Sequence, residues 1–457
     1  MKKLLLIFLL FPLISEAQNL KGIVFSENNT PLENVNILAT SSKTGTITNN
    51  DGFFSINLLP KFKDIEILEF SHIGFLSIKI TPKDLADQNF KIYLKENIQN
   101  LTEVAINNSV NLKAKLAFKV LKPLNDGVFS FGSFVKDDKI YVMGGDASRE
   151  SDPMMKLRDE KPDATALDVQ KELIRNPDHF IFKDNLAVYD IKNDNWETSV
   201  IKFKKRASHN IFYYDDKIYI VGGKRISLNA KFEYLQDQIE VFDTKKNSIT
   251  IDKTNPHQAS DFASFIYKDN IVLMGGSVKK AESGKKDFTK KVHLYNITSG
   301  YWYELAEMPM AKETTGVLVG DKVYLLGGNN GNAVSQIETF DLITEKWQTE
   351  GELFSGLERP ATAYHDDIIY FFENQKIYTY NIQTKQLKEY EINIELKYAA
   401  LLYNDQKLYL IGGRIDKNFS KLPSSKVFSI EIDEFKKTRP SRTKILSQQN
   451  NETKSDG

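Results

Sequence analysis

A Gly-Gly pair follows a short apolar segment five times along this chain. The segments read KIYVMGG, KIYIVGG, NIVLMGG, KVYLLGG and KLYLIGG, and the pairs end at Gly145, Gly223, Gly276, Gly328 and Gly413. The wider interval before the last pair contains Ile368–Phe372, a further copy that lacks the glycines. Similarity at a spacing of roughly 40–50 residues is typical of stacked or radial repeats, so this feature constrains the fold more than any single motif does.

A second landmark recurs at a constant place in each copy. An Asp, Asn or Ser near a strand end is followed, six residues later, by a large apolar residue. All three tryptophans of the chain, Trp196, Trp302 and Trp347, occupy this place, and the other copies carry Ile249, Leu387 and Phe435 there. Two landmarks in constant order over six copies predict six equivalent structural units.

This pattern resembles the kelch repeat, in which two strands ending in Gly-Gly are followed by a variable loop and two further strands with a tryptophan. The resemblance spans residues 128–437 and implies a six-bladed β-propeller. One four-stranded blade cannot bury both of its faces alone, whereas radially packed blades bury them against each other. Polar turns such as Asp137-Asp138 favour the tight hairpins that this arrangement needs. We therefore expect the Gly, Trp and Tyr residues of the repeats to serve the fold.

Residues 19–108 lack the repeat and contain seven short strand-like runs separated by turns, which favours a small antiparallel sandwich. The expected strands are Leu20–Phe25, Val35–Ala39, Gly45–Thr48, Phe53–Leu58, Ile65–Phe70, Leu76–Ile80 and Phe90–Leu94. Ordered phrases such as Gly22-Ile23-Val24, Asp51-Gly52-Phe53-Phe54 and Leu101-Thr102-Glu103-Val104 resemble the carboxypeptidase-regulatory-like domain, which often precedes outer-membrane receptors and other bacterial envelope proteins. The expected fold class is thus all-β, with a prealbumin-like β-sandwich followed by a six-bladed kelch-type β-propeller.

The first residues, 1–18, have the character of a secretory signal peptide. Lys2 and Lys3 precede the apolar run Leu4–Ile14, and small or polar residues follow. No later segment is long and apolar enough to predict a membrane span. We expect an exported protein that is periplasmic, outer-membrane-associated or secreted, and not a lipoprotein, because the chain contains no cysteine to carry the lipid.

Composition excludes several classes of function. The absence of cysteine removes disulfides, thiolate metal sites and cysteine nucleophiles. Sixty-one basic and sixty-one acidic residues give a net charge of zero, which provides no electrostatic case for nucleic acid. The six histidines are scattered without zinc-ligand spacing, and neither a nucleophile elbow nor a phosphate-binding loop is present. We therefore predict no metal site and no cofactor.

Two segments of the repeat region remain open to alternatives. Residues 109–127 are a linker or a ring-closing strand: Leu116–Leu121 joins the last blade from the N-terminal side, or Phe435 supplies that outer strand. The polar segment 438–457 has no apolar periodicity and is expected to be disordered. Residues 163–174 of the first blade predict a short helix, which either caps the central channel or packs on the blade edge.

The strand order predicts which face of the propeller binds. With strands A to D in each blade, the variable B–C loops and the D–A loops emerge on one face, and long loops on a rigid scaffold are where binding usually lies. The ligand-binding candidates are polar residues of these loops: Arg206, Arg225, Arg359, Arg414, Asn329 and Asn330. Arginine suits carboxylates and sugar hydroxyls because of its planar fork of donors. A Lys-rich loop in the third blade, Lys279–Lys291, is a further surface, either for an acidic partner or simply solvated.

Two functions compete on this evidence. The first is a non-enzymatic binding or scaffold protein of the cell envelope that recognises a glycan or an envelope protein. The alternative is a sugar mutarotase or epimerase, because kelch-type sialic acid mutarotases are also exported six-bladed propellers. Mutarotation needs only an acid or base near the sugar, and Glu313 is the catalytic candidate. The sequence does not predict the oligomeric state.

Overall fold

A computed structural model describes residues 18–58, 66–72, 74–96, 112–175, 179–227, 232–280 and 285–446. The chain divides into two compact units, residues 1–109 and 110–457. The proposed signal peptide, the Leu101–Val104 motif and the last eleven residues, 447–457, lie outside the described residues, apart from Gln18. Within the described part, no helix combines the length and the apolar character that crossing a bilayer requires.

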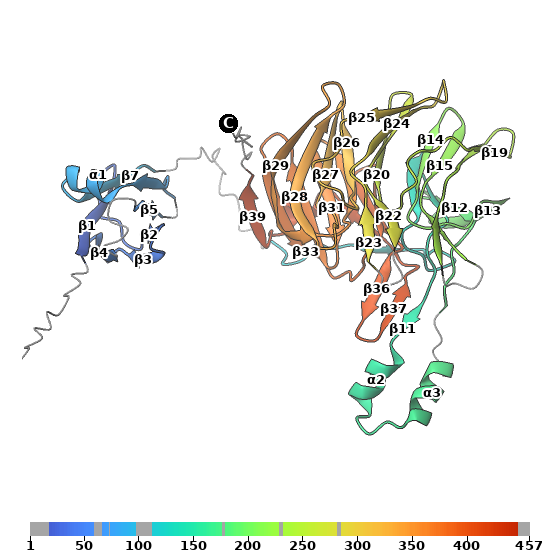
Figure 1. Cartoon of the computed structure of the whole chain (residues 1–457), viewed down its shortest axis with the longest axis horizontal. Coiled ribbons are helices and arrows are strands. Elements are labelled where there is room, and N and C mark those ends of the chain that lie inside the picture. The colour runs from blue at the N-terminus through green and yellow to red at the C-terminus, as the bar shows by residue number, and fades with distance from the viewer. Residues whose placement is uncertain are drawn as a thin grey trace, which may run out of the picture. The chain divides into compact units, whose positions relative to one another are not determined.

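The first unit is a sandwich of two sheets (Figure 1). One sheet has the order β4 (Phe53–Leu58), β1 (Gln18–Ser26), β7 (Lys91–Leu94), and the other β3 (Thr44–Ile47), β2 (Asn36–Ala39), β5 (Leu68–Ser71), β6 (Ile78–Ile80). Side chains of β4 alternate between exposed and buried, as expected for a strand with one face on the core. The expectation of a wholly antiparallel sandwich was wrong in one place, because β1 and β7 pair in parallel.

The parallel pair depends on a helix that was not predicted. Helix α1 (Pro82–Asp87) lies between β6 and β7 and provides the crossover that a parallel connection needs. Thr81 and Asp84 form a capping box at its start, and Leu85 is completely buried in the core of the sandwich. A helix of six residues is too short to show a periodic apolar pattern, so its capping residues were the only sign of it in the sequence.

The second unit is a six-bladed β-propeller (Figure 1). The first four blades, each written from the central channel outward, are β9 (Gly132–Lys136), β10 (Lys139–Met143), β12 (Asn185–Asp190), β13 (Asn195–Lys202); β14 (Asn210–Tyr214), β15 (Lys217–Val221), β18 (Ile239–Asp243), β19 (Ser248–Asp252); β20 (Ala263–Tyr267), β21 (Asn270–Met274), β24 (Val292–Asn296), β25 (Trp302–Leu305); and β26 (Gly316–Val319), β27 (Lys322–Leu326), β28 (Val334–Asp341), β29 (Lys346–Leu357). Neighbouring strands within each blade are antiparallel, and β9 contacts both β14 and the innermost strand of the sixth blade, which closes the ring.

The last two blades each take a strand from elsewhere in the chain. The fifth blade is β30 (Ala361–His365), β31 (Ile368–Glu373), β32 (Lys376–Asn381), β33 (Gln386–Glu391), β39 (Arg442–Ile445), and the sixth is β34 (Ala400–Asn404), β35 (Lys407–Ile411), β38 (Val427–Glu431), β8 (Lys119–Leu121). Strand β8 therefore forms the outer edge of the sixth blade from the N-terminal side. Phe435 lies instead in the short helix α4 (Glu434–Lys437) and packs on Tyr370 and Tyr390.

The disorder expected from residue 438 onward is wrong for the part that the structure describes. Strand β39 pairs with β33, and Arg442 forms an ion pair with the buried Glu389. Leu446 then inserts into the core between the fourth and fifth blades, where only 7% of its surface stays exposed. One buried apolar residue, one ion pair and the pairing with β33 order this segment, and none of them produces the periodicity by which order is recognised in a sequence.

The two landmarks of the repeat have the structural role expected of them. Gly222 and Gly223 have positive φ angles of 64° and 81°, and a Cβ on Gly223 would lie 2.5 Å from the carbonyl oxygen of Ala207. Each tryptophan ring packs on an aromatic side chain of the preceding strand, with centroids 4.6–4.9 Å apart. The indole nitrogen of Trp302 also donates to Thr254 Oγ1, after the last strand of the preceding blade, at 3.0 Å. The tryptophans thus join neighbouring blades.

The fifth copy shows why its glycines are absent. Its second and third strands are joined by a two-residue turn, Asn374-Gln375, with φ angles of 43° and 68°. Asparagine tolerates this left-handed region better than most residues. A blade without a B–C loop does not need the Gly-Gly pair that starts such a loop.

Candidate functional site

The B–C and D–A loops meet on one face of the propeller, which we call the loop face. Isolated bridges join a D–A residue to the residue after each Gly-Gly pair, for example Ala207 to Lys224 and Glu313 to Asn329. Hairpins extend from this face in the second, third and sixth blades: β16 (Lys224–Ile226) with β17 (Glu233–Leu235), β22 (Ser277–Lys280) with β23 (Lys286–Phe288), and β36 (Arg414–Lys417) with β37 (Ser420–Pro423). The topology therefore gathers the variable loops around one end of the channel.

A ring of six residues, which we call the mouth ring, surrounds the channel at the loop face. Each of them lies two residues before the first residue of the innermost strand of its blade: Ser130, Ser208, Asp261, Thr314, Arg359 and Tyr398. Backbone hydrogen bonds of 2.6–3.2 Å connect neighbours around part of the ring, from Thr314 through Asp261, Ser208 and Ser130 to Tyr398. Four members have positive φ angles of 50–58° without being glycine: Ser130, Ser208, Asp261 and Tyr398. Such strained backbone is held by the surrounding structure and often occurs at binding sites.

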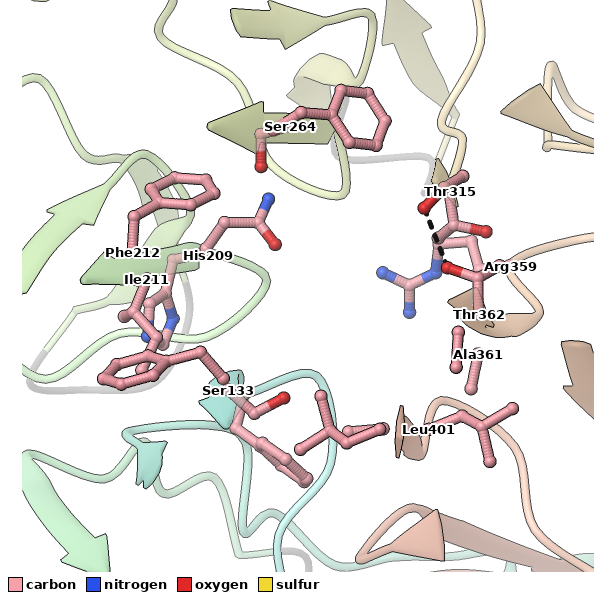
Figure 2. Close-up of a pocket in the computed structure, with 18 of the residues that line it drawn as sticks. Ser133, His209, Ile211, Phe212, Ser264, Thr315, Arg359, Ala361, Thr362 and Leu401 are labelled. Carbon is pink, nitrogen blue, oxygen red and sulfur yellow. Dashed lines mark hydrogen bonds between the residues drawn. The ribbon is translucent and has the colours of Figure 1, made fainter. Parts of the chain in front are cut away.

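The channel behind the mouth ring contains a cavity of about 690 Å³. The innermost strands line it with many hydroxyl groups, including those of Ser133, Ser264, Thr315 and Thr362. Figure 2 shows the guanidinium of Arg359 pointing into the cavity, with Ser133 and Ser264 on other sides of it. Ser264 Oγ is buried and has no hydrogen-bond partner within the described part of the chain. The cavity is thus large enough for a small polar ligand and offers both a cation and hydroxyl groups.

Arg359 is the sequence-predicted candidate that reaches this cavity. Its guanidinium forms an ion pair with Asp261, donates to Ser130 Oγ at 3.1 Å, and stacks on the ring of Tyr398 with 4.3 Å to the centroid. Burial lowers the pKa of this guanidinium, with a smaller effect of Arg414 in the same direction, but arginine stays charged in proteins. Arg359 therefore brings a positively charged, planar donor to the channel mouth.

Arg414 shares an aromatic partner with Arg359, because both guanidinium groups stack on the ring of Tyr398. The Arg414 guanidinium is 4.7 Å from the Tyr398 centroid and 5.6 Å from that of Phe129. It also donates to both carboxylate oxygens of Asp416, at 2.6 and 2.9 Å. Burial works against the charge of Arg414, yet the hydrogen bonds to Asp416 leave its pKa raised. The structure thus brings together two of the arginines that were predicted separately.

Arg206 has a different role from the one expected. It is completely buried and does not line the cavity. Its guanidinium forms an ion pair with Glu240 on the third strand of the same blade and donates to the carbonyl of Gly222 at 3.2 Å. A ligand has no access to a side chain with no exposed surface, so Arg206 supports the second blade from inside.

The same internal support recurs in the next two blades with different chemistry. In the fourth blade, Lys312 Nζ lies 2.5 Å from Glu338 and donates to the carbonyl of Gly327 at 2.6 Å. In the third blade, His257 Nε2 donates to the carbonyl of Gly275 at 2.9 Å, and His257 Nδ1 lies 2.8 Å from His293 Nδ1. In these three blades a buried side chain thus donates to the carbonyl of the first glycine of the Gly-Gly pair, and nothing in the spacing of these residues marked them as partners.

The remaining candidates lie on the loop face but outside the cavity. Glu313 is 2% exposed and is 2.5 Å from Lys286 Nζ of the third-blade hairpin. Asn329 and Asn330 use their side-chain oxygens to cap the turn that follows them, by accepting from the backbone of Gly331 and Asn332. Arg225 stacks on Tyr234 in a cleft of about 390 Å³ between the second-blade and third-blade hairpins.

The lysines of the third-blade loop are partly engaged with neighbouring carboxylates. Lys290 pairs with Glu307 at 2.7 Å, and Lys291 lies close to both Glu304 and Glu307. Together with Lys286, half of the six lysines that were considered as a basic patch are ion-paired. The described part of this loop therefore carries less free positive charge than its sequence suggests.

The first-blade insertion does not cap the channel. Its helices α2 (Pro153–Glu160) and α3 (Ala166–Arg175) line no part of the cavity. They stand on strand β11 (Glu150–Ser151), which pairs with β37 of the sixth blade, and extend away from the blades (Figure 1). The predicted helix is present, but it packs on α2 instead of a blade edge.

Sequence reasoning missed two residues that shape the site, Asp261 and Tyr398. Both stand two residues before the innermost strand of their blade, as Arg359 does in the fifth blade, so aligning the copies on these strands would have found them. Their importance comes from contact across the ring, which depends on residues more than 35 positions apart. A search for charged residues along the chain does not show such contacts.

Comparison with known proteins agrees with both units. The model of the CarboxypepD_reg-like domain matches residues 20–106, and the model of the KLHDC2/KLHL20/DRC7 Kelch-repeats domain matches residues 135–374. A solved structure titled "Structure of YjhT" aligns with a TM-score of 0.49 and 14% identity, over 68% of this chain and 99% of that chain.

Several curated relatives carry kelch names. Kelch-like protein 25 of Xenopus tropicalis is 23% identical over 59% of this chain and 46% of its own length. Human Kelch-like protein 15 is 29% identical over 35% of this chain and 29% of its own length, and a kelch domain-containing protein of Pyrococcus furiosus is 29% identical over 34% of this chain and 50% of its own length. The alignments thus cover half or less of each of these relatives. The kelch model matches more than half of the residues of this chain, and the chain therefore belongs to the kelch-repeat family.

Proposed function

We propose that this protein is a non-enzymatic binding module of the cell envelope, in which the loop face of the propeller recognises a carboxylate-bearing partner, an acidic glycan or an acidic protein segment. The observation that supports this proposal best is the pair of arginines stacked on Tyr398. Both guanidinium groups stack on this ring, so a ligand that brings carboxylate groups to the channel mouth can contact Arg359 at the cavity wall and Arg414 outside that wall. Their planar forks suit a carboxylate geometrically, and hydroxyl groups of the cavity wall complete the polar surroundings.

Both arginines already pair with carboxylates of the protein, which lowers the affinity that we expect for an acidic ligand. Arg359 is paired with Asp261 and Arg414 with Asp416, so a ligand carboxylate competes with carboxylates that are already present. The preference for acidic over neutral ligands therefore depends on the N–H groups of Arg359 and Arg414 that Asp261 and Asp416 do not engage. We expect modest affinity for a single acidic sugar and higher affinity for a ligand that also contacts the hairpins of the loop face.

A thermal-shift screen tests this proposal. Purified protein is heated with sialic acid, glucuronic acid, short acidic peptides and the matching neutral sugars, because a ligand of the folded state raises the melting temperature by mass action. We expect acidic ligands to raise it and R414Q to abolish the rise, while the control R225Q, in the cleft outside the cavity, retains it. Equal shifts with neutral and acidic ligands, or an unchanged response of R414Q, would contradict the proposal.

Location in the envelope is part of the same proposal. It is supported by the basic start and apolar run of residues 1–18 and by the CarboxypepD_reg-like match, and the first unit then serves as a docking or spacer module. Cell fractionation combined with N-terminal sequencing of the mature protein tests it. A protein that keeps Met1 and stays in the cytoplasm would refute export.

A sugar mutarotase is the second candidate, and one observation favours it. The cavity wall contains a carboxylate, Asp261, next to Arg359 and several hydroxyl groups. The acid–base role considered for Glu313 is not favoured by this geometry, because Glu313 lies outside the cavity wall and is paired with Lys286. Exchange of sugar anomers followed by proton NMR tests this function. Acceleration that is lost in D261N would favour the enzyme, and no acceleration with any acidic sugar would favour the binding module.

A further inference from the structure

A glutamate stands in the fifth blade at the place of the first glycine of a Gly-Gly pair. In the other five blades the backbone N–H of the second glycine donates to a carbonyl of the connection that leads into the next blade, and Asn374 makes the equivalent bond to Leu396 at 3.0 Å. Asn374 therefore matches the second glycine, and Glu373 matches the first. A Cβ on any of the five first glycines would lie 2.5–2.9 Å from an atom of the next blade. Glu373 lacks their positive φ, so the fifth blade accommodates a charged side chain at this place.

The carboxylate of Glu373 holds the backbone that carries the mouth-ring arginine. It accepts from the backbone N–H of Arg359 at 3.2 Å and from that of Glu358 at 3.4 Å. Four other members of the mouth ring instead donate their N–H to the carbonyl of the preceding member, so the ring of backbone hydrogen bonds in the described structure is interrupted at Arg359. Burial raises the pKa of Glu373, and the two backbone hydrogen bonds oppose this rise. The cost of burying the charge is thus offset in part by its contact with this backbone.

The two residues that Glu373 holds are the origin of the cluster at the channel mouth. Arg359 supplies the guanidinium that reaches the cavity (Figure 2). The side chain of Glu358 accepts from the hydroxyl of Tyr398 at 2.9 Å, and the ring of Tyr398 stacks on the guanidinium groups of Arg359 and Arg414. One carboxylate therefore fixes two consecutive residues, of which one presents a guanidinium and the other holds the ring that both guanidinium groups contact.

We infer that Glu373 is a positioning residue for ligand binding, which sets the place of Arg359 and Tyr398 at the channel mouth before a ligand arrives. The inference rests on the proposed function, since it concerns the affinity for a carboxylate-bearing ligand. Side chains that are already held in the bound arrangement lose less conformational freedom on binding, and this raises affinity. A negative charge near Arg359 has the opposite effect, because it repels the carboxylate of the ligand. The two effects of Glu373 differ in sign, so a measurement of affinity separates them.

Isothermal titration calorimetry with sialic acid and with glucuronic acid tests this inference. We expect E373A to bind about tenfold more weakly than the wild type, although it removes a negative charge from the channel mouth. E373Q keeps an oxygen that accepts one of the two N–H groups, so its affinity should lie between them, about threefold below that of the wild type. The matched control E395A removes an exposed carboxylate from the connection into the sixth blade, while the hydrogen bonds of Glu373 stay in place, and it retains wild-type affinity.

The outcomes separate the positioning role from the proposed function. Unchanged or tighter binding by E373A, or an equal loss in E395A, would overturn the inference, while binding by the wild type supports the proposed function. If the wild type binds neither acid, the proposed function fails and the role of Glu373 in binding fails with it. Thermal unfolding without ligand shows whether E373A is folded. If it is not, E373Q decides, and an affinity equal to that of the wild type would refute the positioning role.

Discussion

Replacing Arg206 by methionine distinguishes a ligand-binding arginine from a supporting one. The substitution keeps most of the side-chain volume but leaves the buried carboxylate of Glu240 without its cation. Breaking a buried ion pair from one side typically costs about 3–5 kcal/mol, because the remaining charge is buried and uncompensated. The carbonyl of Gly222 also loses a donor. We therefore expect R206M to reduce the free energy of unfolding of the propeller by about 3–5 kcal/mol.

The double variant R206M/E240L separates charge from packing. It removes both charges, and replacing such a pair by apolar residues is often neutral or stabilising. Here the backbone N–H of Lys204 also loses its acceptor, since it donates to Glu240 at 3.1 Å. An unpaired buried polar group costs about 1–3 kcal/mol, so the double variant should be close to or more stable than R206M, despite having one more substitution.

Urea denaturation followed by tryptophan fluorescence measures these differences. All three tryptophans belong to the propeller, so the signal reports the unfolding of this unit and not of the sandwich. The control R225M, on an exposed hairpin, should change stability by no more than about 0.5 kcal/mol. A loss below about 1 kcal/mol in R206M, or a double variant that loses as much as the sum of both single variants, would refute the buried-pair argument.

Three further predictions concern other contacts within the propeller. Burial, reinforced by His293, lowers the pKa of His257 to about 3, so below pH 6.5 the unfolded chain binds a proton that the folded chain does not. The free energy of unfolding should therefore fall as the pH decreases from 7 to 5.5, with a slope of up to about 1.4 kcal/mol per pH unit. Urea titrations should show a smaller slope in H257Q, and an equal slope would contradict this. L446A should destabilise the propeller by about 2–5 kcal/mol in the same assay while I445A, at an exposed position, changes little, whereas equal effects would favour a disordered C-terminal segment. W302F removes the hydrogen bond to Thr254 and should cost about 0.5–1.5 kcal/mol plus lost packing, measured by thermal unfolding, and no loss would contradict a role in joining the blades.

Much of the propeller could be predicted because its signals are local and repeated. Each blade needs a tight turn, a glycine pair that permits close approach of backbones, and an aromatic residue at the blade junction, and these requirements recur at nearly constant spacing. Even the copy without glycines was recognisable, because Ile368–Phe372 keeps the apolar strand while Asn374-Gln375 supplies the turn. The parallel strand pair of the sandwich and the ordered strand β39 had no such repeated signal.

The candidate site was predictable only in part. The loop face followed from strand order, and Arg359 and Arg414 were named because they are arginines in its loops. Their meeting on Tyr398, and the pairing of Arg359 with Asp261, depend on how the mouth ring closes. Arg206 looked equivalent in the sequence, yet it lies two residues before the mouth-ring position of its blade, Ser208, and its side chain pairs with Glu240 inside the blade.

The sequence by itself determined the architecture of this protein: two units of β-structure, six repeats and a face that carries the variable loops. It did so because backbone geometry and blade packing place the same demand on each copy. Only the tertiary structure decided which charged residues are buried supports and which reach the channel, and where the first-blade helices stand. Those outcomes depend on contacts between residues far apart in the chain, such as Arg359 with Ser130 and Glu150 with Lys421, which no local pattern records.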